Sequence, residues 1–437
     1  MPLRARGCGE RNAKLLPGMR PPVASAEDDP EPGSSPIGVE TERLVHITTI
    51  PVTLGFLRGQ AAFLRRKSIG VHAISSPAPE LARFAQEEQV QVHAVEMARQ
   101  ITPLRDLLAL WRVWGVLRGV RPVIVDAHTP KAGLLGMIAA TLARTPVRVY
   151  HLHGLRFVTA SGWKRRLLLL ADRTACALAD RVLAVSPSIR AIAIEEGVCP
   201  PEKIKVLLRG SVNGVDATGR FKPQMELVRS AARSKHGIPQ DALVVGFVGR
   251  LARDKGIVEL AGAWRQLRAN PRLHLLLVGA LDSTDAPPTE IMTALHSDPR
   301  VHRAGQVPVA DTPPLYAAMD VVVLPTYREG FGQVALEAAA MALPIVATMV
   351  SGCVDAVRDA VTGTLVPARD IEGLVGALRR YLEDPALRAE HGSAARRRAL
   401  AEFSPDAMWN ALAEEYGDLI LRARARGPER APTGGAR

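Results

Sequence analysis

Short runs of apolar residues alternate along the first half of the chain with longer segments of helical periodicity. The apolar runs at residues 44–47, 71–74, 123–125, 147–152 and 181–185 have the length and composition of buried strands. Helical patterns lie between them, at about residues 57–67, 132–143 and 163–179. Strands that are apolar throughout and alternate with helices are typical of a parallel sheet with helices on both faces.

The same alternation starts again after residue 225. It predicts strands at residues 243–248, 273–278, 321–324 and 345–347, and helices at residues 257–267, 334–342, 371–383, 385–403 and 407–422. The chain is therefore predicted to be α/β, with two doubly wound, Rossmann-like halves that face a central cleft. In such sheets ligands bind beyond the carboxyl ends of the strands.

The composition divides the chain further. Residues 1–42 hold turn-forming clusters without apolar periodicity, which indicates a disordered tail. We expect one Rossmann-like domain over residues 43–225 and a second over residues 226–405. A helix over residues 406–422 is expected to pack back toward the first domain, before a disordered basic tail at residues 423–437.

Charge is uneven along the chain, whose net charge is +12. Residues 43–225 contain 26 basic and 12 acidic side chains, an excess of +14, whereas residues 226–420 contain 20 and 24. We expect the basic half to meet an anionic partner such as a membrane surface, a lipid phosphate or a nucleic acid. A solvated, arginine-rich surface without a partner is the alternative.

Two basic runs in this half carry apolar neighbours, at residues 63–67 and 163–167. Each is interpreted as the start of an amphipathic helix that can lie on anionic lipid. The alternative is an ordinary helix whose apolar face joins the core. No apolar run approaches the ~20 residues that a bilayer span needs, so no transmembrane helix is expected. The four cysteines lie far apart in the sequence, which favours a reducing compartment.

The strand at residues 243–248 runs into a loop with a glycine and two cations. Gly249, at the strand's end, permits close approach of a ligand to the backbone. Arg250 offers a planar fork suited to a phosphate and Lys255 a compact charge, so the two can converge on one diphosphate. The alternative is a pair of solvated surface cations.

A second glycine-bearing loop follows the strand at residues 321–324 and leads into a helix. The amino end of that helix, near Gly332, offers free N–H groups and a positive dipole end to an anion. Glu329 precedes the helix, and Glu337 lies about one turn inside it. Carboxylates accept hydrogen bonds from paired hydroxyls, so both are candidates for binding a sugar nucleotide. Exposed acids beside a helix start are the alternative.

Two histidines lie at the end of the strand at residues 147–152. His151 and His153 have the spacing of side chains on one face, but no cysteine or third histidine is near them in the sequence. A zinc site needs three or four ligands. His128, at another strand end, is a weaker candidate for the cleft, and the sequence has no Asp-x-Asp motif. We therefore predict no metal site; a structural role for His153 at the strand end stays an alternative.

Together these segments carry a family resemblance. The segments 249–256 and 329–337, the latter with the pattern Glu-Gly-x-Gly-x4-Glu, resemble the retaining glycosyltransferases of family 4, which have the GT-B fold. The resemblance covers about residues 43–422. Residues 126–133, 150–157 and 210–216 are similar to the branch that makes capsular and O-antigen polysaccharides. That branch includes the bacterial N-acetylgalactosaminyltransferase of protein N-glycosylation.

The resemblance implies catalytic and donor-binding roles for the matched residues. Arg250 and Lys255 would bind the donor diphosphate and stabilise it as it leaves. Glu337 would hold the ribose hydroxyls. His153 would lie beside the reacting carbon and the acceptor.

The same resemblance assigns the remaining donor contacts. Glu329 would contact the donor sugar, near the backbone N–H groups of Phe331 and Gly332. Many relatives carry a glycine pair at the first strand-to-helix turn, where this chain has Gly55 alone. We expect Gly55 to contact the acceptor or a phosphate.

The resemblance also implies the reaction: a retaining, metal-independent transfer of a hexose or N-acetylhexosamine from a nucleotide-diphosphate sugar, with a UDP-sugar as the expected donor. No cofactor is expected. The acceptor would be a polyprenyl-diphosphate-linked or other glycan in the synthesis of bacterial capsule, lipopolysaccharide or other glycans. The enzyme would be cytoplasmic and peripheral, on the anionic inner face of the cytoplasmic membrane.

Two other classes of function share part of the pattern. Nucleotide-sugar 2-epimerases have the same two-domain architecture, and an epimer formed without an acceptor would identify one. A basic nucleic-acid-binding protein is the non-enzymatic alternative. It is disfavoured because aromatic residues make up only 4% of the chain and no stacking motif interleaves the basic runs.

Overall fold

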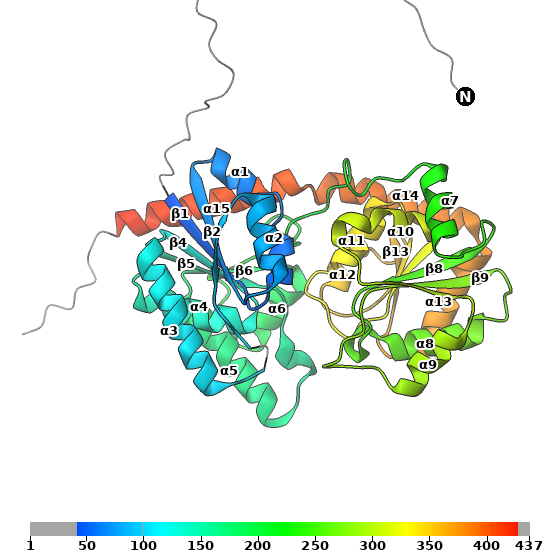
Figure 1. Ribbon diagram of the computed structural model, residues 1–437, viewed down its shortest axis with the longest axis horizontal. Coiled ribbons are helices and arrows are strands. Elements are labelled where there is room, and N and C mark those ends of the chain that lie inside the picture. The colour runs from blue at the N-terminus through cyan, green and yellow to red at the C-terminus, as the bar shows by residue number, and fades with distance from the viewer. Residues whose placement is uncertain (1–41, 99, 427–437) are drawn as a thin grey trace, which may run out of the picture. The chain divides into compact units, whose positions relative to one another are not determined.

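The computed structural model describes residues 42–98 and 100–426. The first half of this chain forms a seven-stranded parallel sheet in the order β3-β2-β1-β4-β5-β6-β7 (Figure 1). Its strands are β1 (Glu42–Ile47), β2 (Ile69–Ser75), β3 (Gln91–Ala94), β4 (Ile124–His128), β5 (Val147–Leu152), β6 (Arg181–Ala184) and β7 (Ile204–Lys205).

The second half forms a six-stranded parallel sheet in the order β10-β9-β8-β11-β12-β13. Its strands are β8 (Leu243–Val248), β9 (Leu273–Val278), β10 (Val301–Gly305), β11 (Val321–Leu324), β12 (Ile345–Thr348) and β13 (Gly363–Val366). Two parallel sheets covered by helices confirm the predicted α/β class.

Helices cover both faces of the first sheet because neighbouring strand residues point to opposite sides. Leu44 packs into the core beneath one set of helices, and Val45, next to it, into the core beneath the other. The elements of this half are η1 (Pro51–Leu57), α1 (Gln60–Arg66), α2 (Pro79–Glu88), α3 (Pro103–Val120), α4 (Pro130–Leu142), η2 (Arg156–Thr159), α5 (Gly162–Leu178) and α6 (Pro187–Glu195).

The second sheet is built in the same way, with separate cores on its two faces. Val244 belongs to one of these cores and Val245 to the other. The elements of this half are α7 (Glu226–Lys235), η3 (Arg253–Lys255), α8 (Ile257–Leu267), α9 (Thr289–Ser297), η4 (Val309–Asp311), α10 (Pro313–Ala318), α11 (Gln333–Ala340), α12 (Cys353–Ala356), α13 (Ile371–Glu383) and α14 (Pro385–Glu402).

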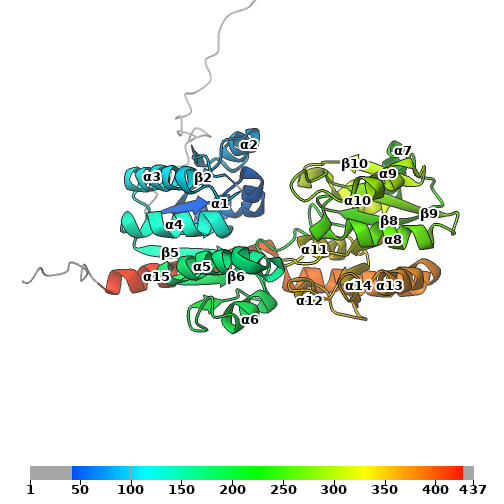
Figure 2. The same ribbon diagram turned by 90° about the horizontal axis from the view of Figure 1, so that it is seen from below.

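The last helix, α15 (Pro405–Ala425), packs against the first half of the chain rather than the second (Figures 1 and 2). Its apolar residues, such as Leu412, join the core that contains Leu44. The buried Glu415 of α15 pairs with Arg181 at 2.8 Å and with Lys205 at 2.5 Å. These contacts join the C-terminus of the described chain to the first sheet.

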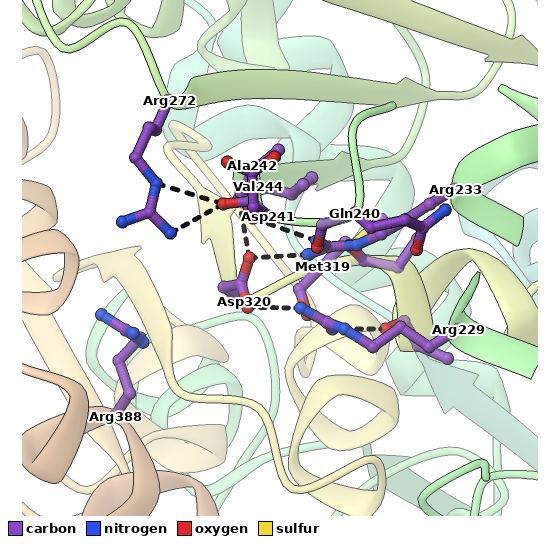
Figure 3. Close-up of polar contacts among 12 residues, drawn as sticks. Arg229, Arg233, Gln240, Asp241, Ala242, Val244, Arg272, Met319, Asp320 and Arg388 are labelled. Carbon is purple, nitrogen blue, oxygen red and sulfur yellow. Dashed lines mark hydrogen bonds and ion pairs between the residues drawn. The ribbon is translucent and has the colours of Figure 1, made fainter. Parts of the chain in front are cut away.

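A buried arginine network fixes the amino ends of β8 and β11 (Figure 3). Arg233 is 1% exposed and donates to the backbone carbonyls of Ala318, Gln240 and Ala242 and to the Asp320 carboxylate at 3.0 Å. The backbone N–H of Val244 also donates to Asp320, at 2.7 Å. The carboxyl ends of the strands, where the candidate site lies, are at the opposite edge of this sheet.

Several predicted elements needed correction. The helix expected over residues 57–67 is a 3-10 turn followed by α1, and the basic run at residues 63–67 ends α1 instead of starting a helix. The run at residues 163–167 does begin α5. Helix α3, with 18 residues, was not predicted. Most of the tails predicted at residues 1–42 and 423–437 lies outside the described residues. Their inner bounds were wrong, because Glu42 belongs to β1 and residues 423–425 belong to α15.

Candidate functional site

The loop after β8 packs closely against the residue that follows β11. Gly249 has φ of 147° and Gly256 φ of 73°, conformations that residues with a side chain rarely adopt. A Cβ at Gly256 would clash with the backbone carbonyl of Pro325, the residue after β11. Glycine therefore lets the two loops that follow β8 and β11 meet, and this contact brings the predicted cations and carboxylates together.

The two predicted cations face carboxylates at this junction. Lys255 forms an ion pair with Glu329. Arg250 pairs with Asp282, and its guanidinium lies 3.4 Å from Asp254. The Arg250 side chain is 46% exposed, whereas those of Lys255 and Glu329 are mostly buried. The loop thus presents two cations whose partners are all side-chain carboxylates.

A third cation, Arg328, was not predicted. It pairs with Asp254 at 3.1 Å and precedes Glu329 in the same loop. Its position next to Glu329 was the available signal in the sequence. Asp282, on the other side of Arg250, has its pKa lowered to about 2 by hydrogen bonds from Thr284, with help from Arg250. Asp282 is therefore ionised at neutral pH.

Glu337 lies deeper than these charges, one turn inside α11. It is 7% exposed, and its Oε2 accepts a hydrogen bond from the Tyr316 hydroxyl at 2.7 Å. Burial raises the pKa of Glu337 to about 7. It does not line the cavity described below. Its role as a ribose ligand stays a prediction.

The amino end of α11 is formed by Gly332, which has φ of 71°. The Phe331 ring is buried against Phe403, with ring centroids 5.4 Å apart. Only the backbone of Phe331 is therefore available to a ligand. Gln333 at the helix start donates to the Gly214 carbonyl at 2.9 Å, which ties this loop to the segment between the two sheets.

A cavity of about 220 Å³ lies between the second-half loops and the first half. Gly330 makes the approach possible, because a Cβ there would clash with the backbone carbonyl of His153. The lining residues are Thr129, Pro130, His153, Gly154, Leu155, Arg156, Val158, Arg250, Asp254, Lys255, Arg328, Glu329, Gly330 and Ser351. The four residues predicted to be catalytic, His153, Glu329, Arg250 and Lys255, thus surround one cavity.

Larger hollows lie elsewhere on the described surface. One of about 900 Å³ is lined by residues such as Arg43, Val123 and Pro146, beside the amino ends of β1, β4 and β5. Ligands of doubly wound sheets bind at the carboxyl ends instead. We therefore regard the smaller cavity, where the cations and His153 converge, as the candidate site.

Gly55 does not line this cavity. It is exposed within η1, with no atom within 4 Å of the place where a Cβ would stand. Its neighbour Phe56 instead stacks on the His153 ring, with centroids 6.1 Å apart and planes inclined by 21°. The predicted contact at Gly55 stays a prediction, and Phe56 is the residue of this turn that the structure places beside the site.

Histidines gather behind His153. The sequence suggested no third histidine near His151 and His153, and this was wrong in space, because His128 at the end of β4 lies against both rings. Possible ligand atoms of these three residues lie within 4.8 Å of one another. Sequence separation hid the cluster, since β4 and β5 are neighbours in the sheet but 25 residues separate His128 from His153.

Comparisons with known proteins agree with this architecture. A family model of a glycosyl transferase 4-like domain matches residues 56–210, and one of group 1 glycosyl transferases matches residues 228–398. A capsular polysaccharide biosynthesis glycosyltransferase of Staphylococcus aureus, CapM, is 31% identical over 390 residues, which cover 89% of this chain and 100% of that protein. The chain belongs to the family 4 glycosyltransferases.

Other relatives of this glycosyltransferase fit the same family. The UDP-Gal:α-D-GlcNAc-diphosphoundecaprenol α-1,3-galactosyltransferase of Escherichia coli is 25% identical over 79% of this chain and 89% of that protein. The crystal structure of HepE from Anabaena, in complex with UDP and glucose, superposes with a TM-score of 0.71 over 86% of this chain and 99% of that one, at 24% identity. This similarity confirms the predicted GT-B fold.

Within the part of the enzyme that the structure describes, we find no helix that is both long and apolar enough to cross a bilayer. Helices α3 and α5 nevertheless expose large apolar side chains, among them Leu104 (86% exposed), Trp111 (64%) and Trp163 (74%).

Proposed function

We propose that this glycosyltransferase transfers a hexosyl or N-acetylhexosaminyl group from a UDP-sugar to a lipid-linked saccharide, with retention of configuration. The observation that carries the proposal is the convergence of Arg250, Lys255 and Arg328 on a cavity that His153 borders from the other half. The relative from Escherichia coli, whose name states a UDP-sugar donor and a diphosphoundecaprenol-linked acceptor, supports the choice of substrates.

The three cations can bind the negative charge of a donor diphosphate. A guanidinium can bind a phosphate through two parallel hydrogen bonds, and an ammonium adds a compact charge. In the structure their partners are carboxylates of Asp254, Asp282 and Glu329. An incoming diphosphate can replace these partners, so the cations would neutralise the charge of the leaving diphosphate without a metal ion.

The chemical step requires no covalent intermediate with the protein. The acceptor oxygen would bond to the anomeric carbon on the face from which the diphosphate leaves. The electron pair of the broken C–O bond would pass to the departing diphosphate oxygen, and the acceptor proton to a phosphate oxygen. Arg250 and Lys255 would stabilise the growing charge on the diphosphate, and Glu329, released from Lys255, would accept hydrogen bonds from sugar hydroxyls.

The nucleoside would lie deeper in the second half. The ribose hydroxyls would hydrogen-bond to Glu337, and the backbone N–H groups near Phe331 and Gly332 would face the phosphate or sugar. Because the pKa of Glu337 is raised to about 7, this carboxyl binds hydroxyls best as an acceptor once it has lost its proton. Donor affinity would then increase with pH through this range.

We further propose that α3 and α5 form the surface that meets an anionic membrane at its cytoplasmic face. The exposed apolar residues Leu104, Leu107 and Trp111 share α3 with Arg105 and Arg112. On α5, Trp163 and Leu170 accompany Lys164 and Arg166. Such mixed faces bind anionic lipid, and each basic residue contributes about 1 kcal/mol.

This face reaches the candidate site. Val158, which is 46% exposed, lines the cavity in the turn that precedes α5. Phe56, 42% exposed, stacks on His153 at the other side. A saccharide on a lipid diphosphate, or another membrane-borne glycan, could thus extend from the membrane to the cavity.

A donor screen tests the proposed function. The enzyme is incubated with UDP-glucose, UDP-galactose and their N-acetylhexosamine counterparts, with and without a bacterial membrane extract, and the release of UDP is measured. We expect acceptor-dependent release with one donor, and its loss in Lys255→Ala, while the matched control Lys235→Ala, an exposed lysine at the end of α7, keeps the wild-type rate. Epimerised donor without any acceptor, or full activity of Lys255→Ala, would refute the proposal.

A further inference from the structure

Three histidine rings form a hydrogen-bonded row that ends at the candidate site. His46 lies in β1, His128 ends β4, and His153 follows β5, so the three come from neighbouring strands of the first sheet. Nδ1 of His46 is 2.9 Å from Nε2 of His128, and Nδ1 of His128 is 2.8 Å from Nε2 of His153. His46 and His128 are buried, whereas His153 lines the cavity.

The distances within this row are those of hydrogen bonds. Two nitrogens that bind one tetrahedral zinc ion at about 2.0–2.1 Å stand roughly 3.4 Å apart. The observed separations of 2.8 and 2.9 Å fall in the range of hydrogen bonds between nitrogen donors and acceptors. Both nitrogens of His128 are already engaged in the row.

The rings are neutral at physiological pH. Burial lowers the pKa of His46 to about 4 and that of His153 to about 3, and it holds the pKa of His128 well below its usual value. A neutral imidazole has one N–H donor and one acceptor nitrogen. All protons in the row must therefore point the same way along it, toward His46 or toward His153.

A buried carboxylate beside the row favours one of these directions. Asp126 is fully buried, and its Oδ2 accepts hydrogen bonds from the Tyr416 hydroxyl of α15 at 2.5 Å and from His151 Nδ1 at 3.3 Å. Its Oδ1 lies 3.7 Å from His128 Nε2. Its Oδ2 lies farther, at 4.0 Å, from His46 Nδ1, the other nitrogen of the same hydrogen bond. The negative charge therefore favours the proton on the nearer nitrogen, Nε2 of His128, over one on Nδ1 of His46.

The far end of the row favours the same direction. Nε2 of His46 and Oε1 of Gln60 are both buried, and neither has a well-aligned hydrogen bond to any described residue. Gln60 nevertheless opposes the effect of burial on the pKa of His46, as an acceptor facing the ring does. A proton on Nε2 of His46 is the arrangement that such an acceptor favours, and it leaves Nδ1 of His46 to accept from His128.

We propose that His128 and His46 are positioning residues that hold His153 as the tautomer with its proton on Nε2. The only ring nitrogen of His153 outside the row, Nδ1, then carries a lone pair and accepts a hydrogen bond from a hydroxyl of a bound sugar. This inference rests on the proposed function for the identity of the ligand. The tautomer itself can be measured without any substrate.

Nitrogen NMR of the full-length enzyme, labelled with 15N in its histidines, tests the proposal directly. The His153 signals are identified by their loss in His153→Gln. We expect a protonated Nε2 and an unprotonated Nδ1 for His153, unchanged between pH 5 and pH 8. A proton on Nδ1 of His153, or stoichiometric zinc in the protein purified without chelators, would overturn the proposal.

Two substitutions at His128 separate positioning from packing. His128→Gln keeps an acceptor and a donor for the two neighbouring rings, so it should keep the His153 tautomer. His128→Phe removes both, so His153 should exchange between tautomers and kcat/KM should fall about tenfold, the value of one lost hydrogen bond. If His128→Phe leaves the tautomer unchanged, His128 does not position His153.

The outcomes also separate this inference from the proposed function. Sugar transfer with a proton on Nδ1 of His153 would overturn the inference and leave the function intact. If the expected tautomer is found in an enzyme that releases no UDP from any donor, the proposed function is overturned and the tautomer of His153 stands. If His128→Phe does not fold, the tautomer of His153 in the wild type and in His128→Gln still decides whether the inference holds.

Discussion

Two clusters of arginine and carboxylate lie at opposite edges of the second sheet, and their partners differ. At the amino ends of β8 and β11, Arg233 and Arg229 bond to backbone carbonyls as well as to Asp320 (Figure 3). At the carboxyl ends, Arg250 and Lys255 pair with carboxylate side chains. A backbone carbonyl is held beside its arginine by the fold, whereas a carboxylate side chain can be replaced at its cation by another anion.

The difference shows how one pair of residue types serves two purposes. The buried guanidinium of Arg233 has lost its water and is satisfied by fixed acceptors, so it stabilises the fold. Arg250 is 46% exposed, so its pairs contribute little to stability and exchange easily. Cations held in this way are oriented before a diphosphate arrives and remain available to bind it.

The largest effect is expected where a buried arginine is removed. Arg233→Met should lower the free energy of unfolding by about 3–5 kcal/mol, because Asp320 and several carbonyls lose their partner. The matched control is Arg272→Met, which removes an exposed arginine whose guanidinium donates to the Asp241 carbonyl, and it should cost less than about 1 kcal/mol. Urea unfolding measures both; equal losses would remove the contrast between the clusters.

The buried carboxylate of Glu337 sharpens the comparison. The folded state raises the pKa of Glu337 from 4.5 to about 7 through burial, so it binds this proton more tightly than the unfolded chain does. Stability conferred by the protonated form is therefore lost as pH rises from about 4.5 to about 7, by roughly 3 kcal/mol. Glu337→Gln, which still accepts from Tyr316, should lack this loss.

Unfolding free energies of wild type and Glu337→Gln, measured at several pH values across that window, provide the test. The free energy of unfolding of the variant should increase steadily relative to that of the wild type as pH rises. Curves that stay parallel would show that Glu337 ionises in the folded enzyme as readily as in water.

The unpredicted cation should have an intermediate effect. Arg328→Ala should weaken binding of UDP about 10- to 100-fold, since one charged hydrogen-bonding partner contributes about 1.5–3 kcal/mol. Arg253→Ala, in the neighbouring loop, is the matched control because Arg253 bonds to the Ala286 carbonyl and does not line the cavity. Calorimetric titration with UDP measures both variants, and equal affinities would exclude Arg328 from the donor site.

The smallest effect is expected at the proposed membrane face. Lys164→Gln should reduce partitioning onto phosphatidylglycerol vesicles about fivefold, because one basic residue contributes about 1 kcal/mol near an anionic surface. Lys235→Gln, in the second half, should leave partitioning unchanged. Sedimentation with vesicles measures this, and similar losses in both variants would indicate a general charge effect.

The regular parts of this fold were readable from the sequence, and the reasons are physical. Strands β5 and β8 were predicted with their observed bounds because strands buried on both faces are apolar throughout. Helix α3 was missed because Leu104 and Trp111 are exposed, so its apolar residues do not mark one buried face. Its sequence therefore lacked the periodicity on which the prediction depends.

The site residues could be predicted from the sequence where they share a loop. Arg250 and Lys255 lie in one loop, and Glu329 and Glu337 flank another, so spacing alone related them. The contact of Asp126 with Tyr416 joins residues 290 positions apart, and no local pattern carries such information. The burial of Glu337 likewise depends on packing that the sequence does not express.

The affinity difference between UDP and uridine tests the central claim most directly. Titration of wild type and of the double variant Arg250→Ala/Lys255→Ala with each compound isolates the contribution of the diphosphate. The account predicts that wild type binds UDP far more tightly than uridine, and that the double variant loses this preference while its affinity for uridine is unchanged. An undiminished preference for UDP in the double variant would contradict it.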